Sequence, residues 1–159
     1  MGADFILRAP YQTLILPYRQ ILSGDSREFA VFLRADDDND VWQFVAGGGE
    51  DGESRTETAV RELFEETGVR IDSSLPFVEL DTQSSIPANI FSGWKEWGND
   101  LLVVTEFAYG VDFTNCEIEI SPEHSEFEWV DIDTVMGLLR FDSNKTALWE
   151  LNTRLERGL

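Results

Sequence analysis

The sequence contains little cysteine, few basic residues and no long apolar run. Its single cysteine, Cys116, allows no internal disulfide and supports neither a zinc cluster nor an extracellular disulfide framework. No apolar run approaches the roughly 18 residues of a membrane span, and no basic region precedes an apolar stretch at the N-terminus. We therefore expect no membrane span, no signal peptide and a cytoplasmic location.

Acidic residues dominate the charge of the chain. The 31 Asp and Glu residues against 12 Lys and Arg residues give a formal net charge of −19, and no segment is basic enough to bind a phosphate backbone. We expect neither a nucleic-acid polymer nor a membrane as a partner. A polyphosphate substrate would have to be bound through metal cations and a few arginines.

The length of 159 residues suits one domain, expected over residues 1–159, with its own buried core. The oligomeric state stays open, and a homodimer is one possibility. Strand patterns occur at Phe5–Leu7, Tyr11–Tyr18, Phe29–Arg34, Val41–Ala46, Phe77–Gln83, Leu101–Tyr109 and Phe127–Val130. Helices are expected from about Arg55, from about Asp131 and after Asp142.

One segment, residues 47–69, combines glycines and carboxylates with clear helix signals. It reads GGGEDGESRTETAVRELFEETGV and follows the strand at Val41–Ala46, so we expect a glycine loop leading into a helix. Ser54 and Glu57 form a capping box that starts this helix, and Gly68 ends it after about thirteen residues. Its apolar residues form one stripe at helical spacing: Ala59, Val60, Leu63 and Phe64.

Three glutamates of this predicted helix share one edge beside the apolar stripe. At 100° per residue, Glu62, Glu65 and Glu66 fall within an arc of about 100°. Each like-charge pair disfavours an exposed helix by roughly 0.2–0.5 kcal/mol, and the macrodipole also disfavours anions in the C-terminal half. A divalent cation would reverse both effects. Taken alone, the three glutamates also fit an ordinary solvated acidic face.

The spacing of the segment resembles the sequence motif of the Nudix hydrolases at every fixed position. Those positions are Gly47, Glu53, Arg61, Glu62, Glu65, Glu66 and Gly68, with the apolar Leu63 and Val69. The resemblance implies an α/β Nudix fold, in which a mixed β-sheet is sandwiched between helices. It also implies that Mg²⁺ or Mn²⁺ binds to Glu62, Glu65, Glu66 and the carbonyl of Gly47. By the same resemblance, Glu53, Arg61 and Gly68 have structural roles.

A second, weaker resemblance concerns Glu123 and His124, which precede Trp129 near the end of a strand pattern. The dATP and dihydroneopterin triphosphate pyrophosphohydrolase branch of the family carries a similar pair after its motif. There the glutamate reaches the metal cluster, as an additional ligand or as the base. Without the resemblance, such a pair would be ordinary surface residues. His124 is not expected to be a ligand, because Mg²⁺ prefers oxygen donors.

The segment between Ser84 and Asp100 is long for a connection and carries Phe91, Trp94 and Trp97. These aromatic residues either stack on the ring of a substrate or cover the core, since their spacing also suits a short packed helix. Trp94 and Trp97 are therefore candidate substrate-binding residues. Two residues that precede the motif are further candidates for the same role: Arg34 and Trp42.

These patterns favour metal-dependent hydrolysis of a nucleoside triphosphate or another nucleoside diphosphate-linked substrate, by attack of water on phosphorus. Glu62, Glu65, Glu66 and Glu123 are the candidate catalytic residues. Glu62 is preferred over Glu123 as the base because it lies within the motif. ADP-ribose or dinucleoside polyphosphate hydrolysis and a non-hydrolytic nucleotide-binding module are the alternatives, and Pro87 is a weak pointer to the ADP-ribose branch.

Overall fold

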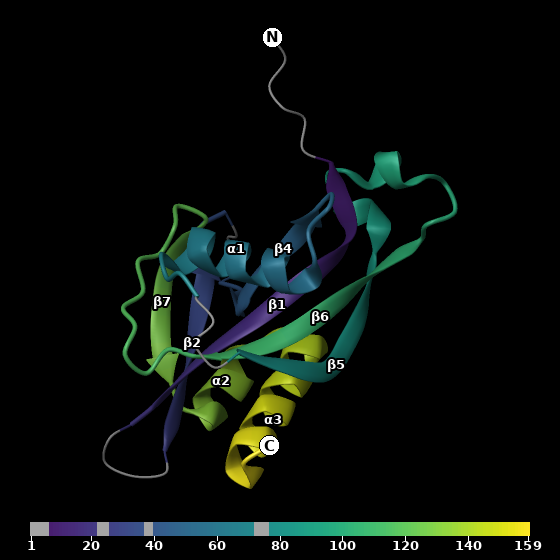
Figure 1. Ribbon diagram of the computed structural model, residues 1–159. Coiled ribbons are helices and arrows are strands. Elements are labelled where there is room, and N and C mark those ends of the chain that lie inside the picture. The colour runs from purple at the N-terminus through teal and green to yellow at the C-terminus, as the bar shows by residue number, and fades with distance from the viewer. Residues whose placement is uncertain (1–6, 22–25, 37–39, 72–76) are drawn as a thin grey trace.

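A mixed sheet forms the centre of the protein (Figure 1). The computed structural model describes residues 7–21, 26–36, 40–71 and 77–159. Within these ranges the sheet has seven strands: β1 Arg8–Gln20, β2 Arg27–Arg34, β3 Trp42–Gln43, β4 Val45–Glu50, β5 Phe77–Pro87, β6 Val103–Asp112 and β7 His124–Val130. The strand predicted at Phe5–Leu7 lies mostly outside the described residues.

Strand β1 is the long central strand, and the rest of the sheet is arranged around it. The main order is β3-β2-β1-β6-β5, in which β1 and β6 are parallel and the other neighbours are antiparallel. Strand β4 pairs with the first part of β1, between Arg8 and Ile15, whereas β2 pairs with its end, from Tyr18 to Gln20. Strand β7 then adds to β2. The sheet therefore divides into two branches along β1.

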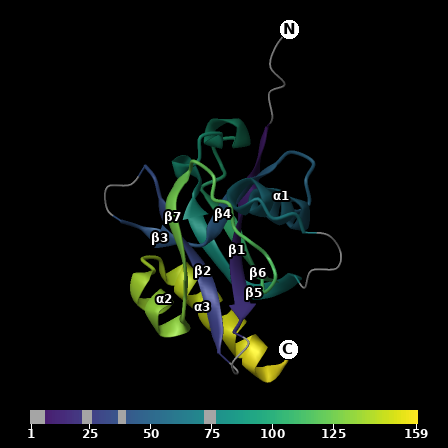
Figure 2. The same cartoon turned by 90° about the vertical axis from the view of Figure 1, so that its left-hand side faces the viewer.

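Helices cover both faces of the sheet (Figures 1 and 2). Helices α2 (Ile132–Leu138) and α3 (Asp142–Arg157) pack on the face that contains Leu14 and Leu16 of β1. Helix α1 (Arg55–Thr67) packs on the other face, against Ile15. Successive side chains of a strand point to opposite faces, so β1 contributes to both cores. This arrangement confirms the predicted mixed sheet between helices.

Helix α1 has the two ends that the sequence predicts. The hydroxyl of Ser54 accepts a hydrogen bond from the Glu57 N–H at 3.1 Å, and the Glu57 carboxylate accepts one from the Ser54 N–H at 3.1 Å. At the other end, Gly68 is left-handed with φ of 74°, and its N–H donates to the Phe64 carbonyl at 2.9 Å. Satisfied ends fix the position of α1 on the sheet.

The three glycines before α1 differ from the prediction. Gly47, Gly48 and Gly49 belong to strand β4, where Gly47 pairs with Thr13 of β1, rather than to a loop. Glycine is a poor strand former on its own, so the local pattern indicates a loop. Pairing with β1 overrides that preference, and the actual turn lies at Asp51 and Gly52.

Helix α3 packs one apolar side against the sheet. Its fully buried apolar residues are Ala147, Leu148 and Leu151. The carboxylate of Glu150 accepts hydrogen bonds from the backbone N–H groups of Asp81 and Thr82, which joins α3 to β5. Among the helices of the described ranges, none combines the length and apolar character that a bilayer crossing requires.

The capping box of α1 gives a stability prediction. Replacing Ser54 with Ala removes the hydroxyl acceptor, so the free energy of unfolding should fall by about 1 kcal/mol. Urea denaturation followed by circular dichroism measures this change. The exposed Ser92, replaced with Ala in the same way, serves as the control. Equal unfolding midpoints for the two variants would show that the cap does not stabilise the fold.

Candidate active site

Helix α1 divides the three predicted metal-binding glutamates between its inner and outer sides. Glu62 and Glu66 are only 6% and 2% exposed, whereas Glu65 faces solvent. Burial of an ionised carboxylate is unfavourable unless hydrogen bonds or opposite charges compensate for it. The partners of Glu62 and Glu66 therefore indicate which kind of ligand the site can bind.

Glu62 lies directly against the glycine strand. A Cβ atom built on Gly47 would lie 2.0 Å from Cδ of Glu62, so only glycine leaves room for this carboxyl group. The Gly47 carbonyl accepts a hydrogen bond from Oγ1 of Thr13 at 3.2 Å. Burial raises the pKa of Glu62 to about 7, although the neighbouring Arg61 opposes the shift. The motif thus requires Gly47 because the helix approaches the strand closely.

Arg61 holds β4 and α1 together. Its Nε and Nη2 atoms donate to the two carboxylate oxygens of Glu53 at 2.8 and 3.0 Å, and Nη2 also donates to the Gly48 carbonyl at 2.9 Å. The hydrogen bond from Arg61 lowers the pKa of Glu53. The remaining nitrogen, Nη1, lies 2.9 Å from Glu62 and 3.2 Å from Glu65. Through these contacts Arg61 joins Glu53 and strand β4 to helix α1, and the structural role of Glu53 and Arg61 stays a prediction.

Glu66 meets two residues from the start of β7. Its Oε2 atom lies 2.7 Å from Nδ1 of His124, and both side chains are buried. The two atoms are in close contact, but Nδ1 has no well-directed hydrogen-bond partner among the described residues. Burial opposes ionisation of Glu66, but its contacts with His124 and Glu123 outweigh burial and lower its pKa. Hydrogen bonding with Glu66, followed by burial, raises the pKa of Glu123 to about 7.

The contact of His124 with Glu66 is the part of this arrangement that sequence reasoning missed. The sequence places Glu123 near the motif only through a family resemblance, and it leaves His124 without a role. The structure pairs His124 with Arg34 across β7 and β2, which turns the imidazole inward toward α1. Only knowledge of this strand pairing would have predicted the contact.

The donor set of this region fits a hard divalent cation. Within the described ranges, no three His, Cys, Asp or Glu side chains already form a finished metal site. The available donors are nevertheless oxygen atoms, which Mg²⁺ and Mn²⁺ prefer. Burial raises the pKa of Glu62, and hydrogen bonding with Glu66 raises the pKa of Glu123, so positive charge near either group would stabilise its ionised form. A cation bound to these carboxylates and the Gly47 carbonyl would supply that charge.

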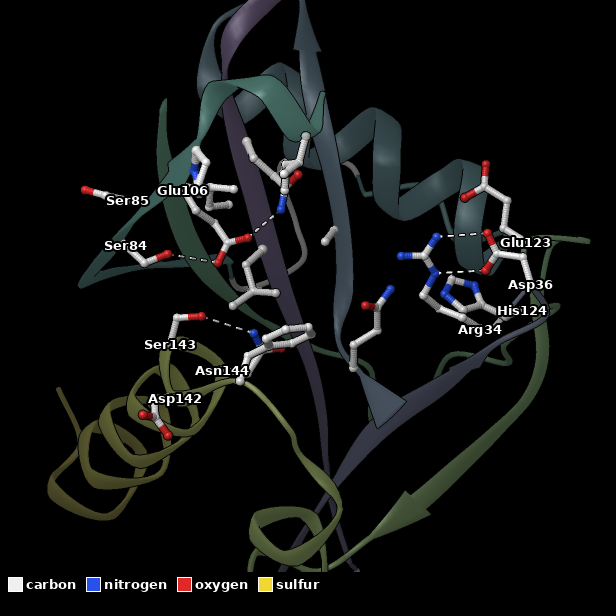
Figure 3. A pocket seen from close by; sticks show the side chains of 18 of the residues that line it. Arg34, Asp36, Ser84, Ser85, Glu106, Glu123, His124, Asp142, Ser143 and Asn144 are labelled. Atoms are coloured by element: carbon white, nitrogen blue, oxygen red, sulfur yellow. Dashed lines mark hydrogen bonds and ion pairs between the residues drawn. The ribbon is translucent and has the colours of Figure 1, made fainter. Parts of the chain in front are cut away.

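We call Glu62, Glu66 and Glu123 the carboxylate cluster. A cavity of about 920 Å³ adjoins this cluster on the α3 side of the sheet. One end is formed by Arg34, Glu123 and His124, so it meets the cluster through the contacts of Glu66 (Figure 3). The guanidinium of Arg34 donates to the Asp36 carboxylate at 3.0 and 3.1 Å. The other end has polar residues from β1, β5, β6 and α3: Gln12, Ser84, Ser85, Glu106, Asp142, Ser143 and Asn144.

Three predicted substrate-binding residues do not line this cavity: Trp42, Trp94 and Trp97. Trp42 packs against the core under α2 and α3. Trp94 and Trp97 bound a short 3₁₀ helix, η2 (Trp94–Trp97), and the indole N–H of Trp97 donates to the Arg8 carbonyl at 2.6 Å. Arg34, by contrast, lines the cavity. Contact of all four residues with substrate stays a prediction.

Comparisons with known proteins identify the family to which the chain is similar. A family model described as the NUDIX domain matches residues 20–149. A dihydroneopterin triphosphate diphosphatase of Escherichia coli strain K12 is 25% identical over 91% of this chain and 93% of that protein. An RNA pyrophosphohydrolase of Dinoroseobacter shibae is 30% identical over 80% of this chain and 85% of that protein.

A crystal structure from Listeria monocytogenes, described as a NUDIX hydrolase, is 42% identical with a TM-score of 0.80, and covers 94% of this chain and 97% of that one. A match of 32% identity to an octanoyltransferase of Myxococcus xanthus spans 76% of this chain but only 32% of the length of that protein. Because the family model covers most of the sequence, the chain belongs to the Nudix family. The predicted class, a hydrolase of phosphoric anhydrides, is confirmed at this level.

The contact between Gly47 and Glu62 gives a prediction about activity. Replacing Gly47 with Ala forces the Glu62 carboxyl group to move, and such a displacement in a catalytic site should lower kcat/KM by about 10²-fold. Steady-state hydrolysis of the best substrate and a melting curve measure the effect. Gly48→Ala is the matched control, because its nearest new neighbour, the Tyr11 carbonyl, is 3.7 Å away. Equal kcat/KM in both variants would contradict the assignment.

Proposed function

We propose that the protein catalyses metal-dependent hydrolysis of a nucleoside triphosphate or another nucleoside diphosphate-linked substrate, by attack of water on phosphorus. The proposal rests on the contact between the carboxylates of α1 and the end of the cavity. The buried carboxylates of α1 meet Glu123 and His124, and these two residues form the same end of the cavity as Arg34. A phosphate chain in that end would lie between the arginine and the carboxylate cluster.

The roles of the residues follow from their chemistry. Glu62, Glu65, Glu66, Glu123 and the Gly47 carbonyl would hold Mg²⁺ or Mn²⁺ through oxygen atoms. When bound, the ion supplies positive charge that favours both the polyphosphate and the deprotonation of water. Arg34 can donate to phosphate oxygens in two directions if its present partner, the exposed Asp36, is displaced.

The base is a choice between Glu62 and Glu123. Both have pKa values raised to about 7, which suits a group that accepts a proton near neutral pH. Sequence reasoning prefers Glu62, but Glu62 is enclosed by Gly47 and Arg61, whereas Glu123 lines the cavity. A general base must reach the attacking water, so this access favours Glu123 as the base and Glu62 as a ligand.

The size and charge of the site favour a small substrate. The cavity volume lies within the usual range of about 300–1,000 Å³ for small-molecule sites. The relatives include a dihydroneopterin triphosphate diphosphatase, whose named substrate is small, and an RNA pyrophosphohydrolase. The net charge of −19 disfavours a long RNA as a substrate. ADP-ribose and dinucleoside polyphosphates are the further candidates, and Pro87 does line the cavity.

Metal dependence is the first functional prediction. Hydrolysis of a panel of nucleoside triphosphates, dihydroneopterin triphosphate, ADP-ribose and diadenosine tetraphosphate should require Mg²⁺ or Mn²⁺. Excess EDTA should abolish it, and either metal should restore it, because the oxygen donors select hard cations. Assays for pyrophosphate and phosphate identify the leaving group. Activity that survives excess EDTA, or a lack of activity on the whole panel with metal, would contradict the proposal.

The second functional prediction separates the base from the ligand. At saturating Mn²⁺, Glu123→Gln should lower kcat by roughly 10²–10⁴-fold, the range for general-base catalysis, and it should weaken Mn²⁺ binding less than Glu62→Gln does. Glu62→Gln should mainly weaken Mn²⁺ binding. Rapid-quench kinetics and calorimetric Mn²⁺ titration measure the two effects. The exposed Glu126, changed to Gln on the same strand as His124, is the control. A larger kcat loss for Glu62→Gln at saturating metal would reverse the assignment.

A further inference from the structure

Three polar side chains form a row at the end of the cavity away from Glu123 (Figure 3). Glu106 of β6 is paired with Gln12 of β1 and with Ser84 of β5 in the strand register, so the three lie side by side on one face of the sheet. The amide of Gln12 donates to Oε2 of Glu106 at 2.5 Å, and the hydroxyl of Ser84 lies 3.4 Å from Oε1. The register of the three strands therefore fixes the positions of these side chains.

Glu106 is a buried carboxyl group that the proposed hydrolysis does not use. It is 6% exposed, and in the part of the chain that the structure describes it forms no ion pair. Burial raises its pKa, and the two neighbouring donors only partly offset the effect. A carboxylate has about four acceptor sites, so Gln12 and Ser84 leave capacity for further donors. Such a group inside a cavity is suited to accept hydrogen bonds from a ligand.

Asn144 adds a second acceptor to the lining of the same end. It lies in the first turn of α3, is 5% exposed, and its Oδ1 atom has no hydrogen-bond partner among the described residues. Its amide nitrogen makes only a long contact, 3.4 Å, with the hydroxyl of Ser143. A buried polar atom without a partner is unfavourable, so a ligand that donates to it would stabilise the site.

The walls around these acceptors suit a flat ring. Ile86, Ile90 and Phe141 line the cavity together with Glu106 and Asn144. Ile90 and Phe141 are among the large apolar side chains that remain exposed in the structure. Apolar walls with a few polar groups are typical of sites for heterocyclic ligands. The phosphate-binding end and this end are therefore chemically distinct.

We propose that Glu106 and Asn144 recognise the ring of the substrate and select an edge that presents an amino group beside a ring N–H. This inference rests on the proposed function, because it assigns the ring end of the same cavity. Guanine and pterin share such an edge. Adenine and cytosine instead present a bare ring nitrogen beside the amino group. Uracil has a ring N–H but carbonyl oxygens on either side of it in place of an amino group. Each of the three bases would therefore place an acceptor against an acceptor.

Equilibrium binding tests the inference without any need for turnover. Calorimetry compares guanosine, inosine and adenosine monophosphates and neopterin on the full chain. Inosine monophosphate differs from guanosine monophosphate only in lacking the 2-amino group. Guanosine monophosphate should therefore bind about 10- to 100-fold more tightly than inosine monophosphate, the range for one hydrogen bond to a charged group. Tighter binding of neopterin than of guanosine monophosphate would identify pterin as the source of the edge.

Variants assign the preference to particular side chains. Glu106→Gln keeps the size of the side chain but turns one acceptor into a donor, so the guanosine-to-inosine ratio should fall to within about 3-fold. Asn144→Ala should also reduce the ratio. Glu79→Gln on β5 is the control, because Glu79 is exposed and does not line the cavity, and its ratio should equal that of the wild type. Melting curves confirm that each variant is folded.

The outcomes separate this inference from the proposed function. Discrimination in binding that depends on Glu106 supports the ring site, even if no substrate is hydrolysed. Metal-dependent hydrolysis with no preference for the amino-bearing ring would leave the proposed function in place and overturn the inference. An unchanged ratio in folded Glu106→Gln would overturn it as well, as would equal binding of all four ligands.

Discussion

The burial of two carboxyl groups on helix α1 is the constraint on which the site depends. Glu62 and Glu66 face inward against the sheet, where an isolated ionised carboxylate would be strongly unfavourable. Several neighbouring residues accommodate these two buried carboxyl groups. Gly47 leaves space for Glu62, Arg61 contacts it, and His124 lies against Glu66. Arg61 supplies positive charge beside Glu62, yet burial still raises the pKa of Glu62 to about 7.

The division of the sheet along β1 brings this cluster to the cavity. Helix α1 packs on one face of the sheet, whereas most of the cavity lies on the other face. Residues of β4 and of the start of β7 connect the carboxylates of α1 with the cavity. Ala46 of strand β4 lines the cavity, and the next residue, Gly47, lies against Glu62. The start of β7 contributes Glu123 and His124 in a similar way. Reactive groups and ring-binding groups can therefore occupy opposite ends of one cavity.

The sequence predicted those features that depend on local signals. The capping box at Ser54 and the left-handed Gly68 placed the two ends of α1, and the spacing of the motif singled out its glutamates. The apolar stripe was only half right, because Ala59 and Leu63 are buried whereas Phe64 is exposed. Features that depend on strand register were not predictable in this way. The glycines of β4 read as a loop because their pairing with β1 is invisible locally. The contact of His124 and the row that contains Glu106 likewise arise from residues distant in the sequence.

The central claim is that the inner carboxylates of α1 and Glu123 form one cation site at the end of the cavity. Anomalous scattering from crystals equilibrated with Mn²⁺ tests this claim most directly. The account predicts an anomalous peak in direct contact with carboxylate oxygens of Glu62 and Glu66, on the side facing Glu123. A peak elsewhere on the acidic surface, or no peak at these carboxylates in saturating Mn²⁺, would contradict it.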